Sequence, residues 1–145
     1  MSQLSDHNKA TTVKFFEQVF NKQNYAIVPD LISPKYAYNG HSATGDQTAA
    51  EQTVAWAKGL QAKFPGLHFS IEAILAEDEK VALRWRMDVT DPATGTKGYV
   101  SGTNILVFAS GKAISNDQGG GHEFIPLASA TGAKGAGGVV DVNPI

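Results

Sequence analysis

The fold is decided by residues 67–124, LHFSIEAILAEDEKVALRWRMDVTDPATGTKGYVSGTNILVFASGKAISNDQGGGHEF. Apolar and polar side chains alternate along this stretch, which is the period of a half-buried β-strand. Turn residues at 77–79, 91–95 and 110–111 divide it into four long strands. Three glycines at 119–121 predict a β-bulge or a close backbone approach in the last strand. The apolar set of the first strand is Leu67, Phe69, Ile71, Ala73 and Leu75.

Three segments before these strands have a helical apolar period. We expect a first helix over residues 5–21, a short second helix over 25–32 and a third over 48–64. The third helix begins with Thr48 and Glu51, which have the spacing of a capping box. Helices followed by a meander of strands predict an α+β fold. We expect a cone-shaped α+β barrel, in which three helices pack on a curved, mostly antiparallel sheet around a pocket.

Composition indicates a soluble globular protein. The chain has 145 residues, of which 42% are hydrophobic and 18% charged, and a net charge of −2. Its 12 Lys and Arg residues are scattered, which argues against nucleic acid as a partner. The chain has no cysteine, and neither a signal peptide nor a membrane span is apparent, so we expect a cytoplasmic protein without a membrane partner. Residues 1–127 are expected to form one domain, and 128–145, rich in Gly and Ala, a flexible tail.

Three segments in this order resemble a known family. They are FFEQVFNKQNYAIVPDLISPKYAYNG (15–40), KFPGLHFSIEAILAEDEKVALRWRM (63–87) and GTNILVFASGKAIS (102–115). Together they resemble the SnoaL-like branch of the nuclear-transport-factor-2-like superfamily over roughly residues 9–123. The resemblance implies a pocket and, as in many members, a homodimer. Members include polyketide cyclases, ketosteroid-isomerase-like enzymes, limonene-epoxide-hydrolase-like enzymes and pure binding domains.

Three charged residues are the candidate catalytic groups. Asp117 in the last strand would shuttle protons, because a carboxylate in an apolar cavity has a raised pKa. The resemblance to cyclases also implies an acid in this region. The resemblance to epoxide-hydrolase-like members implies a second arrangement, in which Arg86 and Asp88 join Asp117 to activate a water and protonate the leaving oxygen. Strand alternation, however, turns Trp85 and Met87 inward, which favours an outward ion-pair ladder for Arg86 and Asp88.

The candidate substrate-binding residues are Tyr38, Asn39, Asn104, His122 and Trp56. A hydroxyl at Tyr38 and an amide at Asn39 can hold a water or a substrate carbonyl. The resemblance places Asn104 near the position of an oxyanion-hole acid in ketosteroid isomerases. A bulge at the glycines would aim His122 inward, and Trp56 supplies apolar wall.

Tyr36 and His41 are further candidates for ligand contact. No residues have metal-ligand spacing and no cofactor motif occurs, so we expect neither a metal nor a cofactor. The leading hypothesis is cofactor-independent acid/base catalysis, of cyclase or isomerase type, on a hydrophobic carbonyl-containing small molecule. A non-catalytic small-molecule binding or dimerisation module and a limonene-epoxide-hydrolase-like enzyme are the alternatives. We also expect a homodimer through an outer sheet face that includes Tyr99, Ile105 and Val107.

Overall fold

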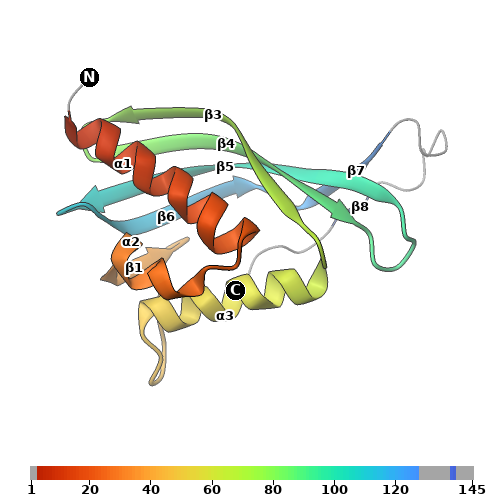
Figure 1. Cartoon of the computed structure of the whole chain (residues 1–145), viewed down its shortest axis with the longest axis horizontal. Coiled ribbons are helices and arrows are strands. Elements are labelled where there is room, and N and C mark those ends of the chain that lie inside the picture. Colours follow the sequence, from red (N-terminus) through yellow and green to blue (C-terminus); the bar gives the residue numbers. More distant parts are fainter. Residues whose placement is uncertain (1–2, 128–137, 140–145) are drawn as a thin grey trace.

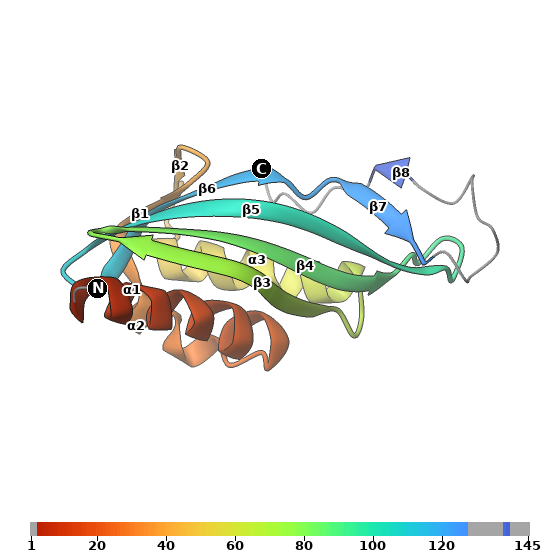
Figure 2. The ribbon, with the colours of Figure 1, turned by 90° about the horizontal axis from the view of Figure 1, so that it is seen from above.

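A computed structural model of the chain describes residues 3–127 and 138–139. Its helices lie on one face of a curved sheet (Figures 1 and 2). The helical elements are α1 (Gln3–Lys14), the π-helical turns η1 (Phe15–Asn21), the 3-10 turn η2 (Tyr25–Ile27), α2 (Val28–Leu31) and α3 (Ala49–Lys63). The strands are β1 (Ile32–Tyr38), β2 (His41–Ser42), β3 (His68–Glu77), β4 (Lys80–Thr90), β5 (Lys97–Ala109), β6 (Lys112–Gly120), β7 (Glu123–Pro126) and β8 (Gly138–Val139).

The sheet confirms the expected α+β cone. Its strand order is β2-β1-β6-β5-β4-β3, β7 pairs with β5, and β8 pairs with β7. The pair β1–β6 is parallel and the remaining pairs are antiparallel. The four expected strands are β3 to β6. Most of the expected flexible tail, residues 128–137 and 140–145, lies outside the described residues.

A β-bulge in β6 decides which of its side chains face the helices. Phe108 pairs with Ala113 but Leu106 pairs with Asn116, so β6 has one residue more than β5 between these pairs. Residues that pair directly lie on the same face of a sheet. Leu106 is buried and Asn116 is buried with it, whereas the next residue, Asp117, is exposed on the opposite face. Unbroken alternation from Ala113 would have placed Asp117 inside.

A second irregularity changes the inward face of β3. Ile71 pairs with Trp85 and Ile74 with Leu83, so three residues of β3 span two of β4. The apolar set expected from simple alternation therefore does not continue inward, and Leu75 is 74% exposed on the outer face.

The helices are fixed to the sheet by an aromatic core and one bridging amide. Phe16 and Phe20 of η1 pack edge-on against Phe69 of β3, with ring centroids 5.4 and 5.3 Å apart. The Asn21 side chain accepts a hydrogen bond from the Phe69 amide (2.7 Å) and donates one to its carbonyl (2.9 Å). The expected capping box of Thr48 and Glu51 starts α3. No helix within the described residues is long and apolar enough to cross a membrane.

Candidate functional site

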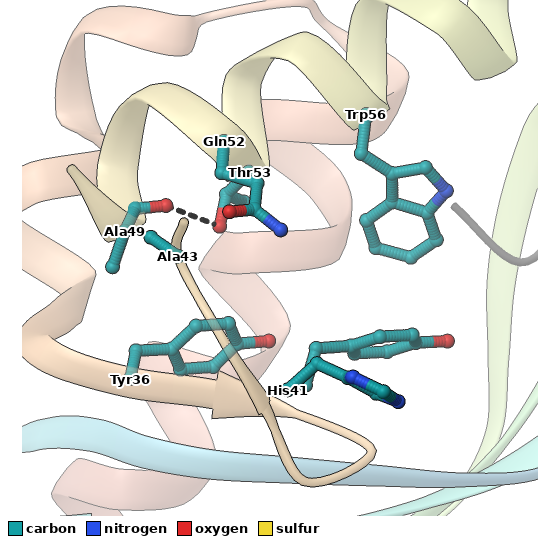
Figure 3. Close-up of a pocket in the computed structure, with 8 residues that line it drawn as sticks. Tyr36, His41, Ala43, Ala49, Gln52, Thr53 and Trp56 are labelled. Atoms are coloured by element: carbon teal, nitrogen blue, oxygen red, sulfur yellow. Dashed lines mark hydrogen bonds between the residues drawn. The ribbon is translucent and has the colours of Figure 1, made fainter. Parts of the chain in front are cut away.

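A pocket opens between α3 and the edge strands β1 and β2. Its volume is about 380 Å³, part of which is open to solvent. Figure 3 shows the Tyr36 ring and the His41 imidazole across from the α3 side chains Gln52, Thr53 and Trp56. The lining is completed by Tyr38, Ala43 and Ala49. The Thr53 hydroxyl donates to a carbonyl within its own helix, so the polar groups free to meet a ligand come mainly from the strands.

A second, deeper pocket has a volume of about 310 Å³. Trp56 lines both pockets. Its walls are mostly aromatic and aliphatic, and amides form its polar end. The lining residues are Phe16, Phe20, Trp56, Leu60, Phe69, Trp85, Asn104, Asn116 and Gln118. Both pockets thus combine apolar walls with a few polar groups, which is the usual composition of a small-molecule site.

A chain of three buried hydrogen bonds crosses the site. The Trp85 indole N–H donates to Asn104 Oδ1 at 2.5 Å. Asn104 Nδ2 donates to Asn116 Oδ1 at 2.7 Å, and Asn116 Nδ2 donates to the Tyr36 hydroxyl at 3.1 Å. All four side chains are buried, so each bond forms where the local dielectric is low.

The direction of this chain follows from the indole, which can donate a hydrogen bond but cannot accept one. The oxygen of Asn104 must therefore face Trp85, and its NH2 group must face Asn116. The same reasoning turns the NH2 group of Asn116 toward Tyr36. The Tyr36 oxygen is thus an acceptor, and no hydrogen bond among the described residues uses its proton. That proton is available to a molecule in the pocket.

A second set of hydrogen bonds orients Tyr38 in the opposite sense. Gln118 Nε2 donates to the carbonyl of Gly120 at 3.2 Å, and a carbonyl can only accept. The Gln118 side-chain oxygen therefore faces Tyr38, whose hydroxyl donates to it in a short hydrogen bond. Tyr38 has its proton engaged, so its oxygen can only accept further hydrogen bonds. Burial raises the pKa of Tyr38 and a hydrogen bond with the Asn39 side chain lowers it to a smaller extent, so Asn39 is one neighbour that donates to this oxygen.

Both phenols stay neutral at physiological pH. Burial raises the pKa of Tyr36 far above its usual value, and the hydrogen bond from Asn116 lowers it to a smaller extent. Burial also raises the pKa of Tyr38, and the neighbouring Tyr36 adds to the effect. The two hydroxyls therefore act as neutral hydrogen-bonding groups.

A family model of the SnoaL-like domain matches residues 12–116, which include most of the helices and strands described above. The chain belongs to the SnoaL-like family. No curated protein matches it at a significant level.

Solved structures of similar fold include enzymes of several kinds. A candidate polyketide cyclase from Acidithiobacillus ferrooxidans is 24% identical, with a TM-score of 0.65 over 81% of this chain and 89% of that one. AclR, a candidate hydroxylase from Streptomyces galilaeus, is 21% identical, with a TM-score of 0.66 over 88% and 86% of the two chains. An LEH-like epoxide hydrolase of M. tuberculosis is 10% identical, with a TM-score of 0.60 over 79% and 82%. At these identities the similarity shows the fold.

Three of the expected binding residues of this SnoaL-like protein lie at the pockets. Tyr38 lines the outer pocket, Asn104 the deeper one, and Trp56 both. Asn39 lines neither. Its Oδ1 accepts a hydrogen bond from the Gln118 backbone amide at 2.7 Å, and its φ of 49° places it at the tight turn between β1 and β2. Asn39 thus holds the strands together at this point.

The three charged candidates do not line either pocket: the expectation for Asp117 is wrong, and Arg86 and Asp88 form the outward pair that strand alternation favours. Asp117 is exposed on the outer face because of the bulge in β6. Arg86 and Asp88 alternate with the inward side chains of β4 and form an outward ion pair at 2.8 Å. The Arg86 guanidinium also lies 4.0 Å from the centroid of the Tyr99 ring. The epoxide-hydrolase arrangement of Arg86, Asp88 and Asp117 is therefore not formed around the cavity.

His122 is also exposed and lines neither pocket. The glycines before it make a close approach instead: a Cβ atom at Gly121 would lie 3.1 Å from the Trp85 ring. This segment therefore packs against the Trp85 indole, and the expectation that it aims His122 inward is wrong.

Asn116 and Gln118 are the site residues that sequence reasoning missed. They are two positions apart in one strand, which is the spacing of side chains on a common face, and this is the signal that could have found them. Asp117 between them drew attention because carboxylates are the usual proton carriers. No group of His, Asp or Glu that could hold a metal ion occurs within residues 3–127 and 138–139.

Proposed function

We propose that this protein binds a small, largely apolar molecule with a carbonyl oxygen, and that Tyr36 donates a hydrogen bond to that oxygen. One observation carries the proposal: the buried chain from Trp85 ends in a phenol whose ring lines an apolar pocket and whose proton no residue within 3–127 and 138–139 accepts. A hydroxyl that accepts a hydrogen bond becomes a better donor, because bonds in a chain polarise one another.

The same geometry supports cofactor-independent isomerisation or cyclisation. His41 lines the rim of the pocket, and an imidazole can remove a proton from the carbon next to a carbonyl. The electrons of the broken C–H bond move to the carbonyl oxygen, where the Tyr36 hydroxyl stabilises the enolate. In a β,γ-unsaturated ketone the imidazole returns the proton to the γ-carbon of the dienolate, the C=C bond moves into conjugation and the carbonyl re-forms. In a diketone the enolate carbon instead attacks the second carbonyl carbon, and the oxygen of that carbonyl takes the proton.

A non-catalytic binding module is the second candidate. It is favoured by the absence of any Asp or Glu among the residues that line the two pockets. A pocket without a carboxylate can hold a ketone as well as transform it. The two functions differ in whether a bound ketone loses its α-proton.

Proton exchange in D2O separates the two candidates without knowledge of the natural substrate. Small cyclic and aryl ketones are incubated with the protein, and deuterium uptake at the α-carbon is followed by NMR. Catalysis predicts uptake above the buffer rate, reduced about 10²–10³-fold in Tyr36→Phe and about 10²–10⁴-fold in His41→Gln. Asp117→Asn, on the outer face, is the matched control and is expected to match the wild type. Binding without exchange would support the binding module, and no binding of any ketone would contradict the proposal.

A further inference from the structure

We propose that Trp85 is a positioning residue that sets the hydrogen-bond polarity of the pocket, making Tyr36 a donor through Asn104 and Asn116. This inference rests on the proposed function for its effect on ligands. Its structural part, the direction of the chain, is independent of any ligand.

The indole is held so that its N–H can point only one way. Trp85 is 2% exposed, and Phe69 packs edge-on against it with ring centroids 5.2 Å apart. A Cβ atom at Gly102 would lie 2.6 Å from Trp85 Cζ2, and one at Gly121 would lie 3.1 Å from Cη2. Side chains at these two glycines would crowd the Cζ2–Cη2 edge of the indole, so glycine there lets the ring keep its place in the core.

The two possible directions of the hydrogen-bond chain differ in free energy only because of this N–H. In the observed direction, Trp85, Asn104 and Asn116 donate three hydrogen bonds. Flipping both amides would preserve the two bonds between Asn104, Asn116 and Tyr36 but would bring an amide NH2 against the indole N–H. A buried donor without an acceptor is strongly unfavourable. Without the indole, both directions would have the same two bonds.

The Tyr38 hydroxyl has the opposite hydrogen-bond polarity to Tyr36, and this polarity does not depend on Trp85. Its orientation comes from the Gly120 carbonyl through Gln118. Tyr36 and Tyr38 are two residues apart on the inward face of β1, so the pocket offers a donor and an acceptor side by side. The ligand class that matches this pair has a carbonyl oxygen close to a hydroxyl or N–H group, as in a hydroxyketone or an enol.

The first test uses the ligand-free protein. In the wild type, NOEs are expected from the Asn116 side-chain NH2 protons to the Tyr36 ring protons, because this NH2 group faces the phenol. In Trp85→Phe we expect these NOEs to weaken and new ones to appear on the Asn104 side. Asn104→Leu, which keeps the side-chain size and the aromatic core, is the second variant. We expect it to weaken the NOEs between Asn116 and Tyr36 as much as Trp85→Phe does. Unchanged NOEs in a folded Trp85→Phe or Asn104→Leu protein would overturn the inference.

The second test measures the hydrogen-bond polarity of the pocket with two probes of similar shape. 1-Indanone can only accept a hydrogen bond, and indole can only donate one. The affinity ratio of 1-indanone to indole is expected to fall roughly tenfold or more in Trp85→Phe. The carbonyl stretching band of bound ¹³C-labelled 1-indanone should shift to higher frequency as the Tyr36 hydrogen bond weakens. Leu60→Ala, which also removes apolar area from the deeper pocket, is the control and should change both affinities alike.

The outcomes separate this inference from the proposed function. Changed NOEs with no binding of 1-indanone to the wild type would support the role of Trp85 and contradict the proposed function. Binding of 1-indanone with an affinity ratio and a carbonyl band that Trp85→Phe leaves unchanged would overturn the role of Trp85.

Discussion

At the scale of single residues, no described Asp or Glu residue lines either pocket, and the buried polar groups of the site are neutral phenols and amides. Two phenols, two asparagines and two glutamines line the two pockets, and Asp117, between Asn116 and Gln118, is on the other side of the sheet. Neutral donors can stabilise a developing oxyanion without the desolvation cost of a buried charge. A consequence is that the donor strength of the site does not titrate near neutrality, since burial raises the pKa of both Tyr36 and Tyr38.

Alkaline pH tests this burial. The unfolded phenol has a pKa of about 10, and the pKa of folded Tyr36 is higher. Below about pH 10 both states hold the proton. Above it only the unfolded state loses the proton, so the unfolding free energy must fall as pH rises, by up to about 1.4 kcal/mol per pH unit for one such group. Urea titrations of wild type and Tyr36→Phe between about pH 9 and 11.5 should show a shallower fall in the variant.

Tyr25→Phe is the control for this measurement, because the Tyr25 phenol is less deeply buried and is expected to change the slope much less. Absorbance at 295 nm gives a second readout, since Tyr36 and Tyr38 should ionise together with unfolding. Equal slopes for wild type and Tyr36→Phe would mean that the Tyr36 phenol is accessible to solvent.

At the scale of elements, irregular segments place the site residues. The bulge in β6 turns Asn116 and Gln118 inward, and the π-helical η1 brings Phe16 and Phe20 to the deeper pocket. Wide helical turns of this kind are often found at functional sites. Asn21 ends η1 and connects it to β3 through two hydrogen bonds between its side-chain amide and the Phe69 backbone.

Removing this connection should affect both stability and the pocket. We expect Asn21→Ala to lower the unfolding free energy by about 1–3 kcal/mol, because the Phe69 amide and carbonyl lose their partner. Urea denaturation gives the stability, and 1-indanone affinity reports on the pocket. Lys22→Ala, at the exposed next position, should leave both unchanged. A stability loss no larger than that of Lys22→Ala would show that η1 is held by its aromatic side chains alone.

At the scale of the whole molecule, the sheet has a helix-covered face and an outer face without helices (Figure 2). Apolar side chains extend across the outer face from β3 to β5: Leu75 pairs with Ala82, and Ala82 with Ile105. Leu75 is 74% and Ile105 52% exposed. Exposed apolar side chains that adjoin one another on a sheet face can form part of a protein–protein interface. Tyr99, which was expected to contribute, is instead partly covered by Arg86.

We propose that two copies pair through this outer face. Light scattering at micromolar concentration should then give the mass of a dimer for the wild type and of a monomer for Ile105→Glu, because a charge in the apolar row opposes its burial. Ala62→Glu, at an exposed position of α3, is the control and should remain dimeric. A monomeric wild type would end the proposal.

The sequence by itself determined the elements, because helix and strand periods are local properties of side-chain spacing. The capping box of Thr48 and Glu51, the four long strands and the outward Arg86–Asp88 pair could all be predicted from spacing alone. The composition of the pocket could not be predicted in this way. Pairing between β5 and β6 places one extra residue in β6, and this exchanges Asp117 for Asn116 and Gln118 on the inward face. The hydrogen-bond chain from Trp85 to Tyr36 joins residues from four strands, so its existence and direction were decided only when tertiary packing brought their side chains together.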